Sequence, residues 1–396
     1  MQRTADIESD RAARLFLLML AVFLGGGLLA SSETLLVPRL KLLLGLDYAQ
    51  ALLIQLLYYA GYLLFAWPAT LLTARLGLMR VVAGALAVMT IGCLAVSAAQ
   101  ASLSFGALLV ALLLLSSGVT VLQIACNGAM ATLGTRDHAA VRFTLLQGFN
   151  ALGAVLGPLG GAWFMLGNGS EMVARIPFLA IAAGFGIMAL AFALNRNLLP
   201  DAGVVGMPTG ARLRAVLREP RMRRGATAIF AYVGAEVTIG ALAVSYLMLP
   251  DRLGATAVTA GRLVSLYWTS AMVGRFAGAW VLQRYPVARL LAWAGAAAIA
   301  CLAGAVFLSG IEGSIALLAV GLANSIMFPT IYSLAMPPRS EDVPTAAMLL
   351  CMAVVGGALV PVATGLAADQ VGLATALALP AICYAVILYF AYTEVS

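Results

Sequence analysis

The stretch Ala69-Thr-Leu-Leu-Thr-Ala74-Arg75 returns later in the chain as Gly278-Ala-Trp-Val-Leu-Gln283-Arg284. Both copies begin with a small residue, place an arginine six positions later and follow a long apolar segment. The two arginines are 209 residues apart (284 minus 75). This spacing puts the copies at matching places in the two halves of the chain. It therefore predicts an internal repeat whose halves run in parallel.

The composition of the chain is that of an integral membrane protein. Of its 396 residues, 63% are hydrophobic and 10% are charged, whereas a soluble domain is about 25% charged. Apolar helices of ~20 residues cross the ~30 Å hydrocarbon core of a bilayer. We predict twelve such helices, with their approximate bounds at 14–40, 48–73, 81–100, 105–133, 142–166, 173–195, 225–249, 259–283, 289–308, 314–336, 343–367 and 373–393.

One long polar stretch divides these helices into six and six. It covers residues 196–224 and is rich in arginine and proline. The predicted organisation is a cytoplasmic tail (1–13), a six-helix bundle (14–195), a basic cytoplasmic linker (196–224) and a second six-helix bundle (225–396).

The positive charges are concentrated on one side of the predicted topology. Most arginines lie in the tail, in the linker and in the loops on the same side. The positive-inside rule makes this the cytoplasmic side, with both termini cytoplasmic. The net charge of +7 thus reflects topology, and it does not indicate a nucleic-acid partner. No nucleotide-binding or metal-binding motif occurs, so we expect no enzyme activity, no cofactor and no metal.

Two acidic residues, Glu33 and Glu236, lie deep within apolar segments. Each is in the first helix of its half. A carboxylate in hydrocarbon costs about 3 kcal/mol or more, so such a residue indicates a functional site. Counted from the cytoplasmic end at 1.5 Å per residue, Glu33 is ~28 Å deep and Glu236 ~16 Å. Different depths predict different roles.

Polar side chains recur at helical spacing in several segments. The fourth helix carries Ser116, Thr120, Gln123 and Asn127 on one face, and amides facing lipid would leave hydrogen-bond donors unsatisfied. This favours a cavity wall over simple bonding between helices. Further candidates for the cavity wall are Gln147, Asn150, Gln55, Tyr59, Tyr62, Tyr232, Trp268, Asn324 and Tyr332. The tyrosines of the second helix fit a sugar-binding face and an interfacial belt equally well.

Several segments resemble the fucose–galactose–glucose:proton symporter family of the major facilitator superfamily. The duplicated stretch is similar to the loop signature of that superfamily, although Ala74 and Gln283 replace its aspartate. The family resemblance rests on the segments Tyr232-Val-Gly-Ala-Glu236-Val, Gly274-Arg275-Phe276, Met327-Phe-Pro-Thr-Ile-Tyr-Ser-Leu-Ala335, Gly356-Gly-Ala-Leu-Val-Pro361, Glu33-Thr-Leu-Leu-Val-Pro-Arg-Leu-Lys41, Leu122-Gln-Ile-Ala-Cys-Asn127 and Gln147-Gly-Phe-Asn150.

The resemblance implies proton-coupled uptake of a monosaccharide through a twelve-helix major facilitator fold in the bacterial inner membrane. The acid of the family's first helix falls on Glu33, the expected proton carrier. The acid of its fourth helix falls on Gln123, so this chain lacks that carboxylate. Glu236 is expected to be either a second proton site or a structural acid. Predicted substrate contacts are Gln123, Asn127, Gln147, Asn150, Tyr59, Tyr232, Trp268, Asn324 and Tyr332, and predicted gating or structural cations are Arg75, Arg275 and Arg284.

Other functions stay open at this point. The main alternative is a proton-coupled efflux antiporter for drugs or other small organic molecules, and amides in the fourth and fifth helices argue against its apolar cavity. Sodium-coupled sugar symport and uncoupled facilitation are further alternatives. We expect a monomer whose partners are the substrate, the coupling ion and membrane lipids.

Overall fold

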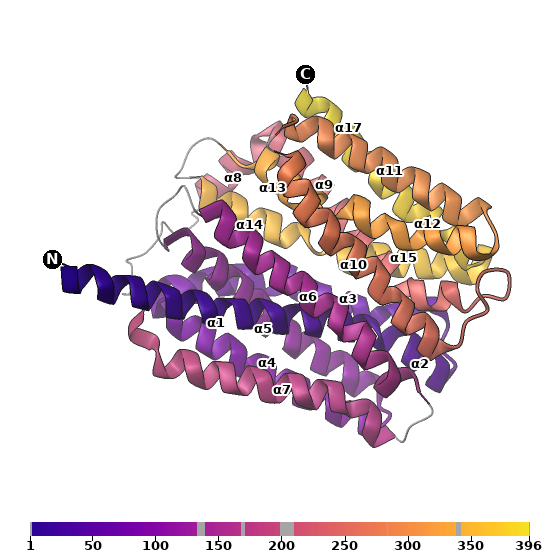
Figure 1. The fold of residues 1–396 in the computed structure, drawn as a ribbon, viewed down its shortest axis with the longest axis horizontal. Coiled ribbons are helices and arrows are strands. Elements are labelled where there is room, and N and C mark those ends of the chain that lie inside the picture. The colour runs from indigo at the N-terminus through magenta and orange to yellow at the C-terminus, as the bar shows by residue number, and fades with distance from the viewer. Residues whose placement is uncertain are drawn as a thin grey trace.

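The structure is a computed structural model that describes residues 2–132, 139–167, 171–198, 210–282, 284–337 and 342–395. All regular elements within these residues are helices (Figure 1). The first half contains α1 (Gln2–Thr34), α2 (Leu36–Leu44), α3 (Tyr48–Leu76), α4 (Leu78–Ala101), α5 (Phe105–Thr132), α6 (Ala139–Leu166) and α7 (Glu171–Leu194). The connection between the halves contains the short helix η2 (Arg196–Leu198) and α8 (Gly210–Arg218). The second half contains α9 (Pro220–Leu247), α10 (Ala257–Val281), α11 (Val287–Phe307), α12 (Gly310–Asn324), α13 (Met327–Ala335), α14 (Val343–Ala353), α15 (Gly356–Val371), α16 (Leu373–Ala376) and α17 (Ala378–Val395).

These helices confirm the predicted all-α fold. Eleven helical segments of the described residues are long and apolar enough to cross a membrane. The remaining predicted span is α10, which carries Arg262 and Arg275 and packs along α6 between the same two ends of the molecule (Figure 1). The two largest differences from the predicted bounds are at the starts of α1, which begins at Gln2, and of α9, which begins at Pro220, inside the predicted linker.

Proline explains three breaks within the predicted spans. Proline has no N–H to donate to the carbonyl four residues earlier, and its ring crowds that carbonyl. Pro38, Pro329 and Pro380 each lie four or five residues after the end of a helix, namely α1, α12 and α16. Each pair of successive helices therefore forms one broken membrane segment. The first break, at Leu35, comes directly after Glu33 and Thr34.

The internal repeat is visible in an aromatic pair on α3 and a matching pair on α10. Tyr58 and Tyr59 pack edge to face, with ring centres 5.1 Å apart. Adding 209 residues gives Tyr267 and Trp268, which pack edge to face at the same centre-to-centre distance. The spacing of the duplicated stretch thus also relates these two helices at the level of single side chains.

Small residues bring each of these helices close to a neighbour in its own half. In the first half Ser116 of α5 lies against Gly61 of α3, and its hydroxyl donates to the Tyr58 carbonyl oxygen. In the second half the glycine and the serine exchange helices. The serine, Ser270, is on α10, which corresponds to α3, and the glycine, Gly321, is on α12. A larger residue at either glycine would meet backbone or serine atoms of the facing helix.

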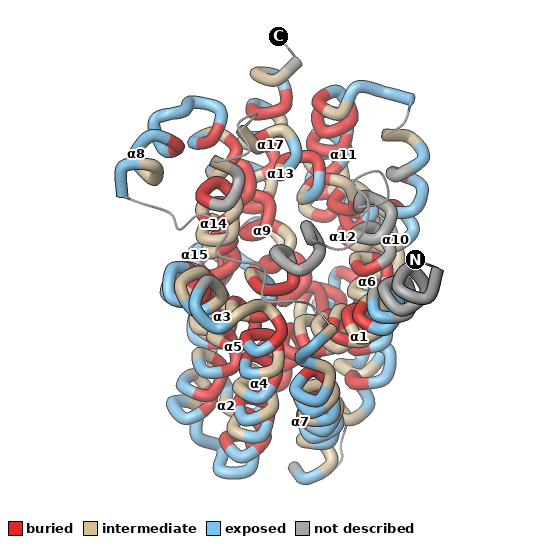
Figure 2. Tube along the Cα trace, turned by 90° about the vertical axis from the view of Figure 1, so that its left-hand side faces the viewer, coloured by how far each residue is buried: buried red, intermediate tan, exposed pale blue. Residues whose placement is uncertain are grey.

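The two halves meet along two seams, α6 with α10 and α3 with α15. Within each half the inward surfaces are buried, and exposed residues cover the outside (Figure 2). Many exposed side chains are large and apolar, including Val110 and Ile187, each 70% exposed, and Phe307, 83% exposed. Lipid chains would cover such a surface, as expected of a membrane protein. We call the end of the bundles opposite the chain termini the distal end; it holds the connections α2–α3, α4–α5, α9–α10 and α11–α12 (Figure 1).

Candidate functional site

Glu33 lies at the end of α1, at the proline-induced break, with its side chain fully buried. Neither carboxylate oxygen forms a hydrogen bond with any residue that the structure describes. Gln55 of α3 lies beside the carboxylate and is also fully buried. Its amide oxygen and nitrogen likewise make no hydrogen bond within the described residues. The two polar groups are thus adjacent, and neither meets the geometry of a hydrogen bond to a described residue, which is unusual for buried polar groups.

Tyr59 connects Glu33 with the second half of the molecule. The tyrosine is close enough to interact electrostatically with both Glu33 and Glu236. Its ring packs on Gly357 of α15, where an added Cβ would lie 2.7 Å from the ring. Both acids therefore lie near one aromatic residue at the interface between the bundles.

This arrangement reduces the expected difference in depth between the acids. A Cβ at Gly240, one turn beyond Glu236 on α9, would lie 4.0 Å from the Thr34 methyl group, next to Glu33. Along the helices, the backbones of Glu33 and Glu236 thus differ in depth by about one helical turn, or ~5 Å. The larger offset expected from the sequence came partly from starting the seventh helix at residue 225, whereas α9 begins at Pro220.

Glu236 differs from Glu33 because it is held by hydrogen bonds. The Tyr232 hydroxyl, one turn earlier on α9, donates to Oε1 of Glu236 at 2.7 Å and also lies 3.3 Å from the Asn324 carbonyl oxygen. Arg275 of α10 is within electrostatic reach of the carboxylate. The Tyr267 hydroxyl lies 3.5 Å from the Glu236 backbone oxygen. The acid is therefore built into contacts among α9, α10 and α12.

Asn324 is the centre of these contacts. Its side-chain nitrogen donates to the Tyr267 hydroxyl at 2.8 Å, and its side-chain oxygen accepts from the Tyr384 hydroxyl at 2.7 Å. The residue is 1% exposed. Together with Tyr232 and Glu236 these residues form a continuous hydrogen-bond network over α9, α10, α12 and α17, which we call the C-half network.

The predicted polar residues of the first half differ in their exposure and in their hydrogen-bond partners. Gln123 of α5 is exposed. Gln147 and Asn150 of α6 are half-buried, and the Asn150 amide donates to the Phe23 carbonyl oxygen of α1 at 3.1 Å. The side chain of Asn127 lies outside the described residues. The structure thus gives Asn150 a partner on a neighbouring helix and leaves Gln123 at a surface.

The remaining predicted residues line the second half. The Trp268 indole nitrogen is buried and makes no hydrogen bond within the described residues. Tyr332 is half-buried and stacks on Phe328, with ring centres 6.0 Å apart. Neither residue belongs to the C-half network.

The three predicted gating cations have separate surroundings. Arg275 crosses between the halves, with Nη1 3.4 Å from the Gln147 carbonyl oxygen. Arg284 is exposed and lies 3.8 Å from the centre of the Trp280 ring. Arg75 is exposed. Of the three, Arg275 is the one positioned beside an intramembrane acid.

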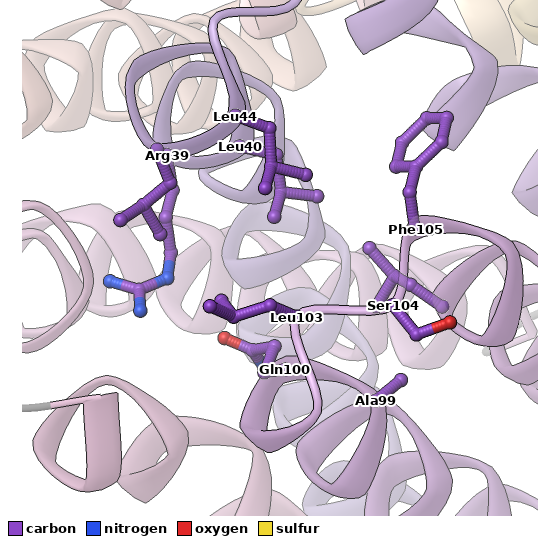
Figure 3. Close-up of a pocket in the computed structure, with 10 residues that line it drawn as sticks. Arg39, Leu40, Leu44, Ala99, Gln100, Leu103, Ser104 and Phe105 are labelled. Carbon is purple, nitrogen blue, oxygen red and sulfur yellow. The ribbon is translucent and has the colours of Figure 1, made fainter.

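A shallow pocket lies away from this centre, within the first half (Figure 3). Arg39 and Leu40 of α2 face Gln100 and Leu103, which come from the end of α4 and the turn after it. The Arg39 guanidinium donates to the Met165 carbonyl oxygen at the end of α6. The pocket is at the distal end and contains neither acid. No cluster of three potential metal ligands occurs within the described part of the chain.

Two residues of the site were not singled out from the sequence. Tyr267 could have been found, because it is the repeat partner of Tyr58 at the 209-residue spacing. Tyr384 had no such signal, since a tyrosine in an apolar helix is equally compatible with a lipid interface. Its role depends on α17 packing against α9 and α11, which only the fold reveals.

Comparison with known proteins agrees with this architecture. Residues 15–343 match the model of the Major Facilitator Superfamily. A glucose/galactose transporter of Brucella abortus is 35% identical over 377 residues, covering 93% of this chain and 91% of the relative. An L-fucose-proton symporter of Escherichia coli is 26% identical over 404 residues, covering 95% and 92%.

Solved structures show the same fold. The crystal structure of the major facilitator transporter FucP in the outward conformation matches with a TM-score of 0.74 and 24% identity, covering 97% of this chain and 99% of that one. The family match, the relatives and the two six-helix halves around a central pair of acids agree with one another. The chain belongs to the major facilitator superfamily, in the group that includes these glucose/galactose and fucose transporters.

Proposed function

We propose that this protein is a proton-coupled symporter that takes up a monosaccharide across the bacterial inner membrane by alternating access. The names of its relatives support a sugar substrate, and the name of one of them includes a proton. The buried, unbonded carboxyl group of Glu33 supports proton coupling and carries the proposal.

The surroundings of Glu33 make its charge state dependent on access to water. A buried carboxyl group without a hydrogen-bond donor is far more costly as an anion than as a neutral acid. It can lose its proton only when solvent or another partner reaches it. Because the residue lies at a helix break beside the interface of the bundles, rocking of the halves would expose it to each side in turn.

We place the sugar between the two acids, against the repeated aromatic pairs. The aromatic rings of Tyr59 and Trp268 come from α3 and α10, and Gln147 and Gln123 offer amides to hydroxyl groups. A sugar ring has apolar faces and polar edges, so this combination suits it. Tyr232, Tyr332 and Asn127 complete the proposed wall.

Two predicted substrate contacts take a different proposed role. The Asn324 amide is occupied by two tyrosines and the Asn150 amide by a backbone carbonyl. We assign both to holding helices together, with Asn324 supporting the wall that faces the sugar. We also assign Glu236 a structural role, as an acid of the C-half network that holds helices together.

Uptake into proteoliposomes tests the function. Purified protein should accumulate glucose, galactose or fucose when the outside is more acidic than the inside, and an imposed sodium gradient at equal pH should not drive accumulation. Accumulation under sodium alone would contradict proton coupling. Sugar equilibration without accumulation under either gradient would indicate facilitation, and absence of transport of any sugar would favour the efflux alternative.

A further inference from the structure

An acidic side chain of the second half caps a helix of the first half at the distal end. Asp369 of α15 accepts hydrogen bonds from the backbone N–H groups of Tyr48, at 2.8 Å, and Ala49, at 3.0 Å. These are the first two residues of α3. The Asp369 side chain is thus bonded to residues 321 and 320 positions away in the sequence.

The start of α3 is organised to receive this carboxylate. The first N–H groups of a helix have no partner within the helix and carry partial positive charge. Asp47 and Gln50 form a capping box, which satisfies the Asp47 and Gln50 N–H groups. The N–H groups of Tyr48 and Ala49 remain, and these are the two that Asp369 binds. The bundles are therefore joined at an otherwise unsatisfied helix end.

Close backbone packing one turn away brings Asp369 into reach. A Cβ at Gly365 would lie 2.9 Å from the Tyr48 carbonyl oxygen and 3.0 Å from the Ala49 Cα. Residues four apart lie on the same face of a helix, so Gly365 lets α15 approach α3 and Asp369 then binds its end. The other seam at this end is a contact of small and apolar groups, where a Cβ at Gly261 would lie 2.8 Å from Ala162 and Leu166.

We propose that Asp369 is a latch that holds the distal end closed and must be released in each transport cycle. Alternating access requires this end to open while the other closes. Opening separates α15 from α3 and leaves two helix N–H groups and one carboxylate to water. The bonds made only in the closed form shift the equilibrium toward that form. The proposal concerns gating, and it holds whichever substrate or coupling ion is moved.

The test measures the width of the distal end directly. Spin labels at Ser102, after α4, and Ser309, before α12, report the separation of the halves from exposed positions. They are introduced as cysteines into the full chain with its five native cysteines replaced by serine, in lipid nanodiscs. Asp369→Ala should raise the ratio of open to closed distal ends about tenfold, the effect of losing a charge-assisted bond. Asp369→Asn keeps one acceptor oxygen and should give a smaller shift in the same direction.

Glu312→Gln is the matched control. Glu312 is an exposed acid at the same end, in the first turn of α12, and it forms no hydrogen bond or ion pair with a described residue of the other bundle. Its replacement should leave the distance distribution unchanged. Identical distributions in wild-type protein, Asp369→Ala and Asp369→Asn would overturn the latch. So would an equal shift in Glu312→Gln, since the effect would then be one of general charge.

Discussion

Glu33 and Glu236 occupy corresponding helices of the two halves, yet their surroundings are opposite. Glu236 accepts a bond from Tyr232 and is joined through Asn324 to two further tyrosines. Glu33 is fully buried beside Gln55 and forms no hydrogen bond to a described residue. A fixed network stabilises one charge state, whereas an unbonded site can change its charge when its access to water changes. The asymmetry between matching positions therefore points to Glu33 as the site that moves protons.

The largest effect is expected from Glu33→Gln, which keeps the shape of the side chain and removes its ability to carry a proton. Sugar accumulation driven by a pH gradient should fall by roughly 100-fold, the scale on which losing a proton-transfer group acts. Exchange of labelled for unlabelled sugar needs no net proton movement and should persist. Uptake into proteoliposomes measures both. Full accumulation by this variant would mean that another group carries the proton.

Gln55→Leu should give the next largest effect. The substitution removes the polar side chain beside Glu33 that can donate to the carboxylate or accept from the acid. Proton-driven uptake should fall about tenfold, the scale of losing a bond that the amide can form to the charged carboxylate during the cycle, with a smaller effect on exchange. Gln100→Leu is the control, because Gln100 is also a buried glutamine without a described partner but lies beside the distal pocket. Equal losses in both variants would show a general effect on folding.

Asn324→Leu tests the other side of the comparison. It leaves the hydroxyls of Tyr267 and Tyr384 without their shared partner. Interhelical bonds in membranes contribute less than in water, so we expect a loss of about 1–2 kcal/mol in the free energy of unfolding. Thermal denaturation in detergent measures this loss. Asn195→Leu removes an amide that lies directly after α7 and donates, among the described residues, only to the Ala191 carbonyl oxygen of that helix, so it should cost less. Equal costs would argue against a network.

The smallest effect is expected from Glu236→Gln. The amide oxygen can still accept from the Tyr232 hydroxyl, so the network should survive. Proton-driven uptake should stay within about threefold of wild type, since one hydrogen bond is weakened and not lost. Initial uptake rates in proteoliposomes check this. A collapse of accumulation with intact exchange would make Glu236 a second proton site.

The sequence was sufficient for the fold because membrane helices leave strong local signals. Apolar length, the positions of arginines and the duplicated stretch ending in Arg75 and Arg284 predicted two six-helix halves. Three of the breaks inside spans also have a local cause, namely proline. The two intramembrane acids were evident because carboxylates are so costly in hydrocarbon.

The partners of the acids could not be predicted in the same way. Helical spacing identifies the face of a helix but not the helix opposite it. Asn324 was therefore expected to contact substrate, whereas α10 and α17 supply the tyrosines that bind its amide. The bonds between Asp369 and the start of α3 join residues 321 and 320 positions apart, and no local sequence pattern predicts such bonds.

Sugar-evoked proton movement tests the central claim most directly. A pH-sensitive dye enclosed in proteoliposomes should report acidification when sugar is added to wild-type protein at equal pH on both sides. Glu236→Gln should give the same signal, and Glu33→Gln should give none while still exchanging labelled sugar. Proton movement that persists in Glu33→Gln, or that disappears in Glu236→Gln, would contradict the assignment of the two acids.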